Sequence, residues 1–439
     1  MMSNTKTTNR RIQTLTNHLT AANFPDINVP KSIYAHDRMS EEATTHIISK
    51  LMHDAERPYF PDPINDWGTV TRGNPPAHLL PANELPAAHL TPSTWFCDVQ
   101  SDHFVDPPYV RSPCTVETSL KLDLPSLIQL GKKFGTIKVM KAMQCLNVDS
   151  PLGQGVWEGV RLSTILKQCC GDIENCRRLY YWGYHNNDLK QIFRSSISYT
   201  ECFENVPNEP PIFLAYKLNG KPLPLIRGGP VRMIVPHAHG FKNVKFLQHI
   251  RLSNDYRIND TYAAIDEGNE GNDPSSIQKT YTTIDQRMGS EPIHLGHEIE
   301  ISGVLMNGRT PCHHLEYWIR SLDVGAVEFT KLGDLDEELL NGNRVAFDLP
   351  KAPLNLNDNL PNGILAKEVF GVNGNGVPKV WPLPFSYVQW KVSLKGVLKV
   401  GSYEIRARAV DVMGNKQPEP RISKKSGRNS IGVRRLKIV

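Results

Sequence analysis

Residues 227–236 limit most strongly what this chain can fold into, because they place a charge within an apolar strand. Val231, Met233 and Val235 alternate as expected for one face of a β-strand, and Arg232 falls on the other face. An unpaired buried guanidinium is very costly. The fold therefore has to supply Arg232 with an anionic or hydrogen-bonding partner.

The neighbours of Arg232 indicate what this partner is. Gly228 lets the backbone approach another group closely, and Arg227, Lys242 and Lys245 add positive charge nearby. These residues suit a buried phosphate held by several donors. A salt bridge from the arginine to a core carboxylate, beside an ordinary turn, fits the same residues equally well at this stage.

Composition narrows the class of protein. The chain has 439 residues, enough for two domains and an appendage, and a formal net charge of +5. It contains no long run of lysine and arginine, so we expect no nucleic-acid partner. No apolar run reaches the roughly 18 residues of a membrane span, so we expect no membrane contact.

The basic pair near the start is not followed by an apolar segment. We therefore expect a cytoplasmic protein, or a periplasmic one if a leader has been removed.

The eight cysteines contain no CxxC pair. This spacing favours free thiols in a reducing compartment over a disulfide framework. Cys169, Cys170 and Cys176 form the densest group, and two interpretations remain for them, a metal cluster or packed core thiols. Adjacent cysteines in an amphipathic stretch favour core thiols.

The pattern of apolar residues divides the chain into three parts. Residues 1–85 begin helically, at 9–22 and 40–54, and continue as a proline-rich arm. Residues 86–285 mix short strands and helices, which predicts an α+β domain that ends in a polar linker at 264–292. Residues 286–439 carry short strands between turns, which predicts a β-sandwich. The predicted helices are 124–134 and 161–170; the predicted strands are 136–143, 178–182, 212–216, 231–235, 246–252, 299–305, 314–321, 345–349, 388–394 and 401–410.

Several segments in a fixed order resemble the sulfite oxidase family of molybdenum enzymes over roughly residues 90–420. A further segment, Arg406-Ala-Arg-Ala-Val-Asp411, resembles the immunoglobulin-like dimerisation domain of that family. The segments in the first part are Met143-Gln-Cys145-x-Asn147, Trp157-x-Gly-Val-Arg-Leu, Asn219-Gly-Lys-Pro-Leu-Pro224, Gly229-Pro-Val-Arg232 and Gly240-Phe-Lys-Asn-Val-Lys245.

This resemblance implies a sulfite-oxidase-type molybdopterin domain of mixed sheets and helices, followed by an immunoglobulin-like β-sandwich that forms a homodimer. It implies one molybdenum–molybdopterin per chain, with Cys145 as the thiolate ligand of the metal. A deprotonated cysteine is a soft ligand that suits molybdenum. Because the sequence contains neither a CxxCH motif nor a haem module, we expect no haem and an external electron acceptor or donor.

The resemblance also implies which residues hold the cofactor. Arg232 and Lys245 match phosphate-binding positions, Lys242 matches a basic neighbour, and Arg227 stands where the family has a histidine. His237-Ala-His239, with His313-His314, has the spacing of zinc ligands, but the family fold favours cofactor contacts for the first pair. The remaining cofactor contacts that the resemblance implies are Gly228, Phe96 and Asn147.

Two departures from the family concern the substrate. Sulfite-oxidising members carry arginines after a Thr-Pro segment and after the ligand cysteine, where this chain has Asp98 and Asp149. Two acidic residues near the metal would repel sulfite, so we expect a neutral or cationic substrate. Tyr262 is the nearest match to the active-site tyrosine of the family, and Tyr256 is its rival.

The expected reaction is two-electron oxygen-atom transfer, with Tyr262, Asp98 and Asp149 shaping the pocket. The Trp95-Phe96-Cys-Asp98 segment looks closer to the branch that includes the bacterial methionine-sulfoxide reductase catalytic subunit. An S- or N-oxide reductase is therefore an alternative. A metal-free dimeric binding protein on the same fold is the other alternative.

Overall fold

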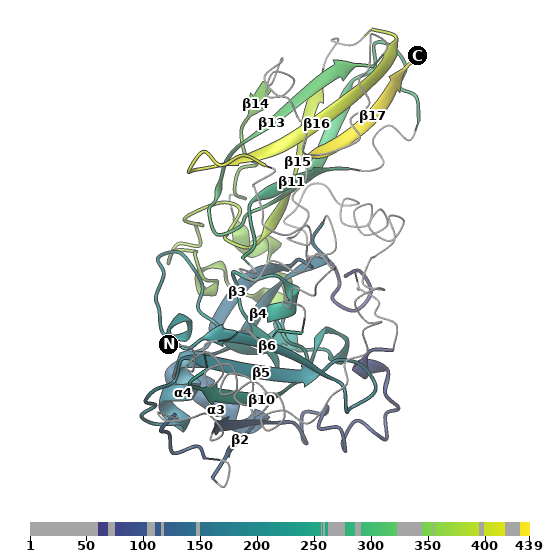
Figure 1. Ribbon diagram of the computed structural model, residues 1–439. Coiled ribbons are helices and arrows are strands. Elements are labelled where there is room, and N and C mark those ends of the chain that lie inside the picture. Colours follow the sequence, from purple (N-terminus) through teal and green to yellow (C-terminus); the bar gives the residue numbers. More distant parts are fainter. Residues whose placement is uncertain are drawn as a thin grey trace, which may run out of the picture.

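The computed structural model shows two parts along one long axis (Figure 1). The lower part, coloured blue to teal, holds two sheets with helices α3 and α4, and the upper part, green to yellow, holds two further sheets. No helix among the described residues is long and apolar enough to cross a membrane. The structure describes residues 60–68, 75–102, 110–115, 118–145, 150–255, 257, 260–261, 277–285, 291–322, 345–353, 355–394, 399–417 and 431–439.

The first sheet of the lower part has the strand order β2-β1-β10-β5-β6. β1 and β10 run parallel although they lie far apart in the chain, and the other neighbouring strands are antiparallel. Alternate residues of these two strands, such as Cys97 and Ile250, enter the core, so one face of the sheet is buried. The bounds are β1 (Phe96–Ser101), β2 (Leu120–Asp123), β5 (Arg178–Tyr184), β6 (Ile192–Ser198) and β10 (Leu247–Ser253).

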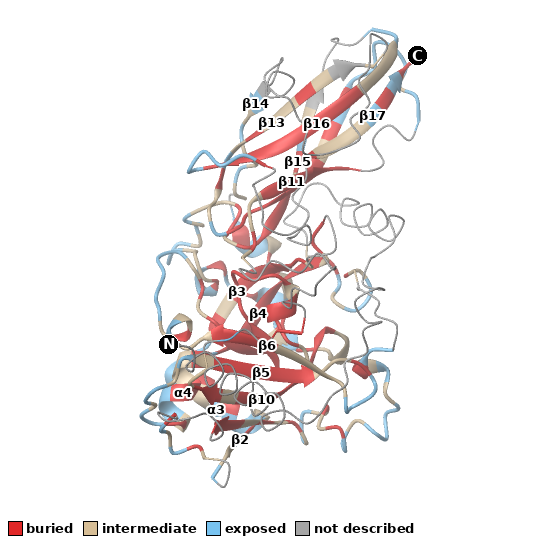
Figure 2. Ribbon diagram, in the orientation of Figure 1, coloured by how far each residue is buried: buried red, intermediate tan, exposed pale blue. Residues whose placement is uncertain are grey.

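The second sheet has the antiparallel order β3-β4-β7-β8, with β9 paired to β7. Helix α3 begins after Asp123, whose carboxylate accepts a bond from Ser126 N at 2.8 Å. Leu127 of α3 and Ile165 of α4 are fully buried in a core that both sheets share, and Figure 2 shows β3, β4 and β5 largely buried. The bounds are α3 (Leu124–Phe134), β3 (Ile137–Met143), β4 (Gly153–Arg161), α4 (Leu162–Cys169), β7 (Phe213–Leu218), β8 (Lys221–Pro222) and β9 (Arg232–Ile234).

The upper part is a two-layer sandwich. One layer has the order β11-β12-β15 and the other β14-β13-β16-β17, and each neighbouring pair within them is antiparallel. Ile301 and Val388 of the first layer share a buried core with Leu315 and Ile405 of the second. The bounds are β11 (Tyr281–Ile284), β12 (Ile299–Met306), β13 (Cys312–Ser321), β14 (Val345–Phe347), β15 (Tyr387–Leu394), β16 (Gly401–Asp411) and β17 (Gly432–Ile438).

One segment of the C-terminal half leaves the sandwich and covers the lower part. Within residues 355–386, Leu383 is buried in a cluster with Met140 of β3. The backbone continues the contact, because Ala142 N donates to Phe385 O at 2.8 Å. The C-terminal half therefore supports β3 from one side.

The predicted α+β order agrees with the lower part, and the predicted helices match α3 and α4 closely. Two segments differ. The sequence pattern predicts no strand at residues 153–161, but these residues form β4. The glycines of β4 allow close packing against neighbouring segments of the protein. Residues 281–284, inside the predicted linker, form β11 and pair with β12. The predicted helices at 9–22 and 40–54 lie outside the described residues.

The β4–β7 contact yields a prediction. The register of the two strands shifts at Gly159, where a Cβ atom would overlap Leu214 O. We expect Gly159→Ala to lower the free energy of unfolding by about 2–4 kcal/mol, because neither backbone can move aside without breaking ladder bonds. Gly374→Ala is the control, since nothing lies within 4 Å of its new Cβ. Urea unfolding of both variants tests this, and equal midpoints would contradict it.

Candidate cofactor-binding site

Cys145 lies just beyond the end of β3 and is half-buried. Gly240 N, in the η5 turn (Gly240–Lys242), donates to Gln144 O at 2.7 Å, and a Cβ at Gly240 would lie 4.0 Å from Cys145 Cα. From the C-terminal half, Tyr281 Oη donates to Gln144 Oε1 at 2.7 Å. Cys145 is therefore partly exposed and lies beside a loop, residues 236–245, that we call the basic loop.

Lys141 holds the basic loop in place, and the sequence analysis did not identify this residue. Its ammonium group, fully buried, donates to Pro236 O at 2.7 Å, Ala238 O at 3.1 Å and Gln278 Oε1 at 2.9 Å. Burial, and then the charge of Arg232, lower the pKa of Lys141 well below its ordinary value. The available signal was a lysine between apolar residues of a predicted strand, similar to the signal that singled out Arg232.

Arg232 is buried in β9 and bonds only to backbone oxygens within the described chain. Nε donates to Asn243 O at 2.9 Å and Nη1 to Arg227 O at 3.0 Å, and the guanidinium lies 5.3 Å from the Trp157 ring centroid. No described carboxylate pairs with it, and Nη2 has no described acceptor. Burial, and then the charge of Arg227, lower the pKa of Arg232 to about 9. The alternative of a salt bridge to a core carboxylate therefore does not hold among the described residues.

Gly228 and Lys245 meet directly beside Arg232. Gly228 has φ 99°, and a Cβ there would lie 2.7 Å from the Lys245 Cβ. The glycine is therefore required for contact with Lys245, whose Nζ donates to Ile226 O at 3.1 Å. Asn243 Nδ2 donates to His239 O at 2.9 Å, so the basic loop connects this cationic end to the Cys145 end.

Arg227 has a different role from the expected phosphate contact. Its side chain turns toward the N-terminal arm, where Nε donates to Pro63 O, Nη1 to Gly68 O at 3.3 Å and Nη2 to Trp67 O at 3.1 Å. Each of its three nitrogens thus has a backbone acceptor. The physical reason is that buried carbonyl oxygens of an irregular arm need donors, and a guanidinium supplies several at once.

Lys242 is also directed away from the expected phosphate. Its buried Nζ donates to Ser196 O at 2.6 Å and to Asp260 Oδ2 at 2.5 Å. Asp260, fully buried as a side chain, also accepts from Ser195 Oγ at 2.7 Å. This ion pair neutralises Lys242 and ties the basic loop to β6, so the lysine is a structural group here.

His237 and His239, both buried, do not form a metal site with described residues. His237 Nε2 lies 2.8 Å from Glu201 Oε1, and Nδ1 lies 3.0 Å from Glu209 Oε1, which also pairs with Arg309 at 2.8 Å. Burial opposes protonation of His237, but its hydrogen bonds to the two glutamates outweigh burial and raise the pKa. His313 and His314 lie in β13 of the sandwich.

The described residues contain no group of three or more histidine, cysteine or acidic side chains able to hold a metal ion. Within this part of the chain, the zinc interpretation of the histidines therefore does not hold. By the same finding, Cys169, Cys170 and Cys176 do not form a metal-binding group with the described residues. Cys170 is fully buried in the hydrophobic core, as expected for a packed thiol.

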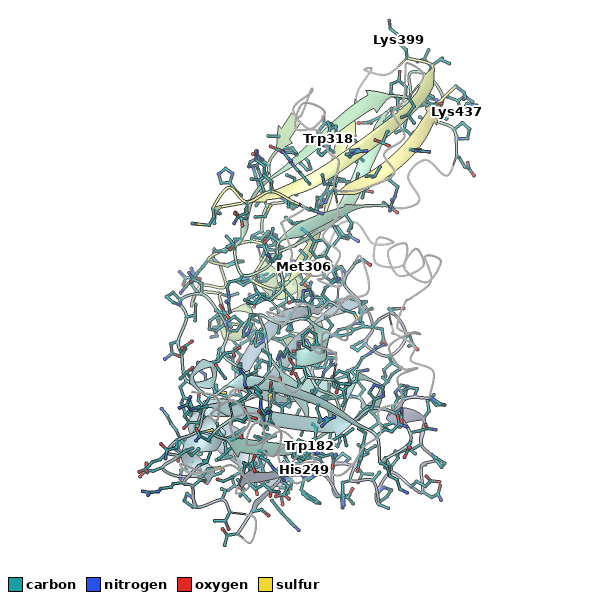
Figure 3. All side chains as sticks on the ribbon, in the orientation of Figure 1. Trp182, His249, Met306, Trp318, Lys399 and Lys437 are labelled. Atoms are coloured by element: carbon teal, nitrogen blue, oxygen red, sulfur yellow. The ribbon has the colours of Figure 1, made fainter. Side chains whose placement is uncertain are left out.

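Asp98 and Phe96 lie on the face of β1 that points away from the predicted pocket. Asp98 is in register with His249, which stacks on Trp182 with ring centroids 4.7 Å apart (Figure 3). The neighbouring Tyr181 points to the opposite face, where Oη donates to Lys242 O in the basic loop at 2.9 Å. Strand alternation therefore places Asp98 away from that loop, contrary to the prediction.

Phe96 shares the face of Asp98 by the same alternation. Its ring meets His89 edge-on with centroids 4.6 Å apart. Four other predicted site residues cannot be placed, because Asn147, Asp149, Tyr256 and Tyr262 lie outside the described residues.

The groups around the basic loop fit a molybdopterin. Cys145 supplies a soft donor at one end, and Arg232 keeps Nη2 for an anion at the other. Ser150 Oγ, five residues after Cys145, and Gln278 Nε2, beside Lys141, are buried and have no described partner. Buried polar atoms of this kind call for a ligand or water.

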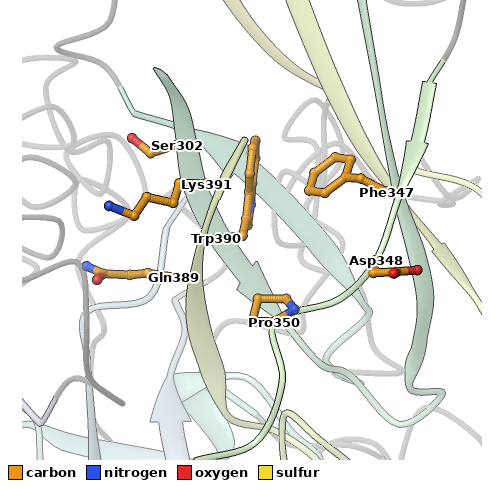
Figure 4. A pocket seen from close by; sticks show the side chains of 7 residues that line it. All are labelled: Ser302, Phe347, Asp348, Pro350, Gln389, Trp390 and Lys391. Atoms are coloured by element: carbon orange, nitrogen blue, oxygen red, sulfur yellow. The ribbon is translucent and has the colours of Figure 1, made fainter. Parts of the chain in front are cut away.

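A pocket of about 220 Å³ lies in the sandwich (Figure 4). Phe347 and Trp390 form its apolar wall, with ring centroids 5.2 Å apart. It contains no cysteine, histidine or arginine. Its lining residues are Ser302, Phe347, Asp348, Pro350, Gln389, Trp390 and Lys391.

The chain is similar in sequence and in fold to known molybdenum enzymes. Residues 114–260 match the family described as oxidoreductase molybdopterin binding domain. Human mitochondrial sulfite oxidase is 24% identical over 240 residues, 52% of this chain and 41% of the human protein. Inducible nitrate reductase [NADH] 2 of Glycine max is 26% identical over 292 residues, 61% of this chain and 28% of that protein. The chain thus spans less than half the length of these relatives.

The crystal structure of the sulfane dehydrogenase SoxCD from Paracoccus pantotrophus has a similar fold, with a TM-score of 0.51. It is 14% identical in sequence, and the match covers 80% of this chain and 79% of that one. Residues 114–260 are therefore a molybdopterin-binding oxidoreductase domain. Over about half of its length, the chain is similar to members of the sulfite oxidase family of molybdopterin-dependent oxidoreductases.

The His237 cluster gives a pH-dependent prediction. Because the folded-state pKa is raised above the ordinary 6.5, the stabilisation is fully present below pH 6.5 and is lost as pH rises through the raised value. We expect His237→Gln to cost about 2–4 kcal/mol of unfolding free energy at pH 6 and less at higher pH. Urea unfolding of both proteins between pH 6 and pH 9 measures this difference. A difference that stays constant or grows with pH would contradict the raised pKa.

Proposed function

We propose that this chain is a molybdenum-dependent oxidoreductase that holds one molybdopterin through Arg232 and Lys245 and ligates the metal through Cys145. The observation that carries the proposal is the 2.7 Å bond from Gly240 N to Gln144 O, because it holds the basic loop against the thiol. The other end of that loop is Lys245, which packs on Gly228 beside Arg232. A soft ligand at one end and phosphate donors at the other suit this cofactor.

When bound, the molybdenum centre supplies two-electron oxygen-atom transfer. The chain supplies position and charge. Cys145 ligates as the thiolate, so its proton leaves when the cofactor binds. Lys141 and Asn243 hold the basic loop through buried hydrogen bonds, and Arg232 meets the phosphate with little reorganisation because Trp157 and two carbonyls already orient its guanidinium.

The substrate that we propose is neutral or cationic, and it is not sulfite. The two segments that carry arginines in sulfite-oxidising members have none here, so an oxyanion would lack its bidentate donors. Asp98 no longer supports this argument, since it faces away from the basic loop, and the remaining acidic residue is Asp149. Reduction of a neutral S- or N-oxide is the reverse direction of the same chemistry and fits the same requirement.

We further propose that the sandwich is the immunoglobulin-like domain of the family and forms a homodimer. The support is its two-layer architecture and the resemblance of residues 406–411 to the family segment. Sedimentation equilibrium of the full chain tests the dimer, and a monomer at micromolar concentration would contradict it. Electrons then pass to or from an external partner, because the proposal includes no second redox group.

Metal analysis tests the proposed function. Protein from a host that makes the cofactor should contain about one molybdenum and one pterin per chain. Cys145→Ser should lose the metal or change its absorption spectrum, because a hydroxyl is a poorer ligand for molybdenum than a thiolate. Cys176→Ser is the control, since Cys176 is also of intermediate burial and its thiol bonds to backbone.

Two results would contradict this proposal. Absence of molybdenum and pterin from the unmodified chain would leave a binding protein on the same fold. Sulfite oxidation that Cys145→Ser abolishes and Cys176→Ser preserves would overturn the proposed substrate class while leaving the metal assignment intact.

A further inference from the structure

The pocket in the sandwich lies along the edge of one of its layers. β15 is the last strand in the described order β11-β12-β15, and the pocket touches three consecutive residues of it, Gln389, Trp390 and Lys391. Figure 4 shows the indole of Trp390 directed toward Phe347 and Lys391 directed to the opposite side of the strand. A pocket that touches three residues in a row, whose side chains alternate between faces, lies against the edge of the strand.

The main-chain groups of Lys391 point away from the sheet. Lys391 stands opposite Ser302 of β12, and Ser302 O accepts from Asp285 N at 2.8 Å on the β11 side. Main-chain groups alternate in direction along an antiparallel strand, so this pair exchanges no bonds and Lys391 N–H and C=O face outward. Tyr387 confirms the alternation, because its N and O bond to the side chain of Gln154 at 2.7 and 3.2 Å. Among the described residues, Lys391 N–H and C=O have no partner.

The wall of the pocket is aromatic and held in place. Trp390 Nε1 donates to Thr282 Oγ1 at 2.7 Å, and the indole lies over Gly303, where a Cβ would come within 2.4 Å of Trp390 Cζ2. The Phe347 ring completes the wall. The volume of about 220 Å³ is below the roughly 300–1,000 Å³ of most sites for free ligands. The pocket therefore suits one side chain better than a whole small molecule.

The charges that line the pocket do not balance. Lys391 Nζ lies 3.4 Å from Glu300 Oε2, which offsets its charge. The other charged residue of the lining, Asp348, is exposed and has no partner among the described residues. A carboxylate beside an aromatic wall favours an apolar stem that ends in a cation, as in lysine and arginine.

We propose that the β15 edge binds an extended segment of a partner protein, which adds as an antiparallel strand and places one lysine or arginine in the pocket. The segment bonds to the main chain of Lys391, and its residue opposite Trp390 directs the basic side chain toward Phe347 and Asp348. This site goes beyond the proposed function, since none of its residues belongs to the candidate cofactor-binding site.

A second copy of β15 fits the pocket less well. Paired antiparallel at this edge, it would present the residues that share the face of Trp390, which are Val388, Trp390 and Val392. None of these is a cation, so Asp348 would stay unbalanced. The charge of the pocket therefore favours a different, basic segment.

The test uses the full chain and labelled, amidated heptapeptides of the form Thr-Val-Thr-X-Thr-Val-Thr, in which X is lysine, leucine or glutamate. Fluorescence anisotropy gives the Kd of each peptide. The lysine peptide should bind about tenfold more tightly than the leucine peptide, the gain expected for one hydrogen bond to a charged group, and the glutamate peptide most weakly. No binding of the lysine peptide, or equal binding of lysine and glutamate, would overturn the proposal.

A charge variant separates the pocket contact from a loss of folding. Asp348→Asn should remove the preference for lysine and leave the Kd of the leucine peptide unchanged, whereas a misfolded chain would lose both. Asp172→Asn, which changes an exposed acid just after α4, is the matched control and should keep the preference. A lysine preference that survives Asp348→Asn would contradict the role of Asp348.

Main-chain pairing has its own test. N-methylation of the two threonines that flank X should abolish binding, because their N–H groups face β15, and N-methylation of X should not. Lys391→Pro should weaken every peptide, since it removes the outward N–H and no bond to β12, and Lys391→Ala should not. If methylation of the flanking threonines has no effect, the pocket binds a free cation and no strand is added.

Sedimentation equilibrium of Lys391→Pro and Lys391→Ala distinguishes a second copy of the chain. Equal oligomeric states support the partner segment. A dimer that only Lys391→Pro dissociates would show that β15 pairs with itself and would overturn the assignment. Neither measurement requires the cofactor, so a chain without molybdenum can still bind the lysine peptide, and the two proposals fail separately.

Discussion

The rest of the candidate site depends on the buried ammonium group of Lys141. It donates to two carbonyl oxygens of the basic loop and to the side chain of Gln278, just before β11. A cation is buried only where such acceptors replace its water, and three acceptors on two different segments define where those segments meet β3. Cys145 follows two residues after the end of that strand, so one buried group fixes the basic loop close to the segment that carries the thiol.

The basic residues that look equivalent in the sequence have different partners in the structure. Lys242 pairs with a buried carboxylate, Arg227 holds the N-terminal arm, and Lys141 holds the loop. Arg232 keeps a donor that no described residue uses, and Lys245 lies next to it. The carboxylate of Asp260 neutralises Lys242, whereas uncharged oxygen atoms fix the positions of Arg227 and Lys141 without removing their charge.

The C-terminal half supports the site as well as forming its own sandwich. Tyr281 of β11 bonds Gln144 beside the thiol, and residues 355–386 cover one face of β3. Arg309, between β12 and β13, reaches Glu209 in the His237 cluster. These contacts join the two halves at separate points, so residues of both halves hold β3 and the segment that follows it.

Local patterns determined much of this protein from sequence alone. Alternation along residues 137–143 and 247–253, and the amphipathic repeat at 124–134, predict their elements because these depend on near neighbours. The cysteine and the buried arginine could also be singled out. The tertiary structure alone decided that glycine-rich β4 is a strand, that Asp98 faces away from the basic loop, and which cation meets which acceptor. These features depend on partners far away in the chain, and no local pattern records the register or strand face that brings them together.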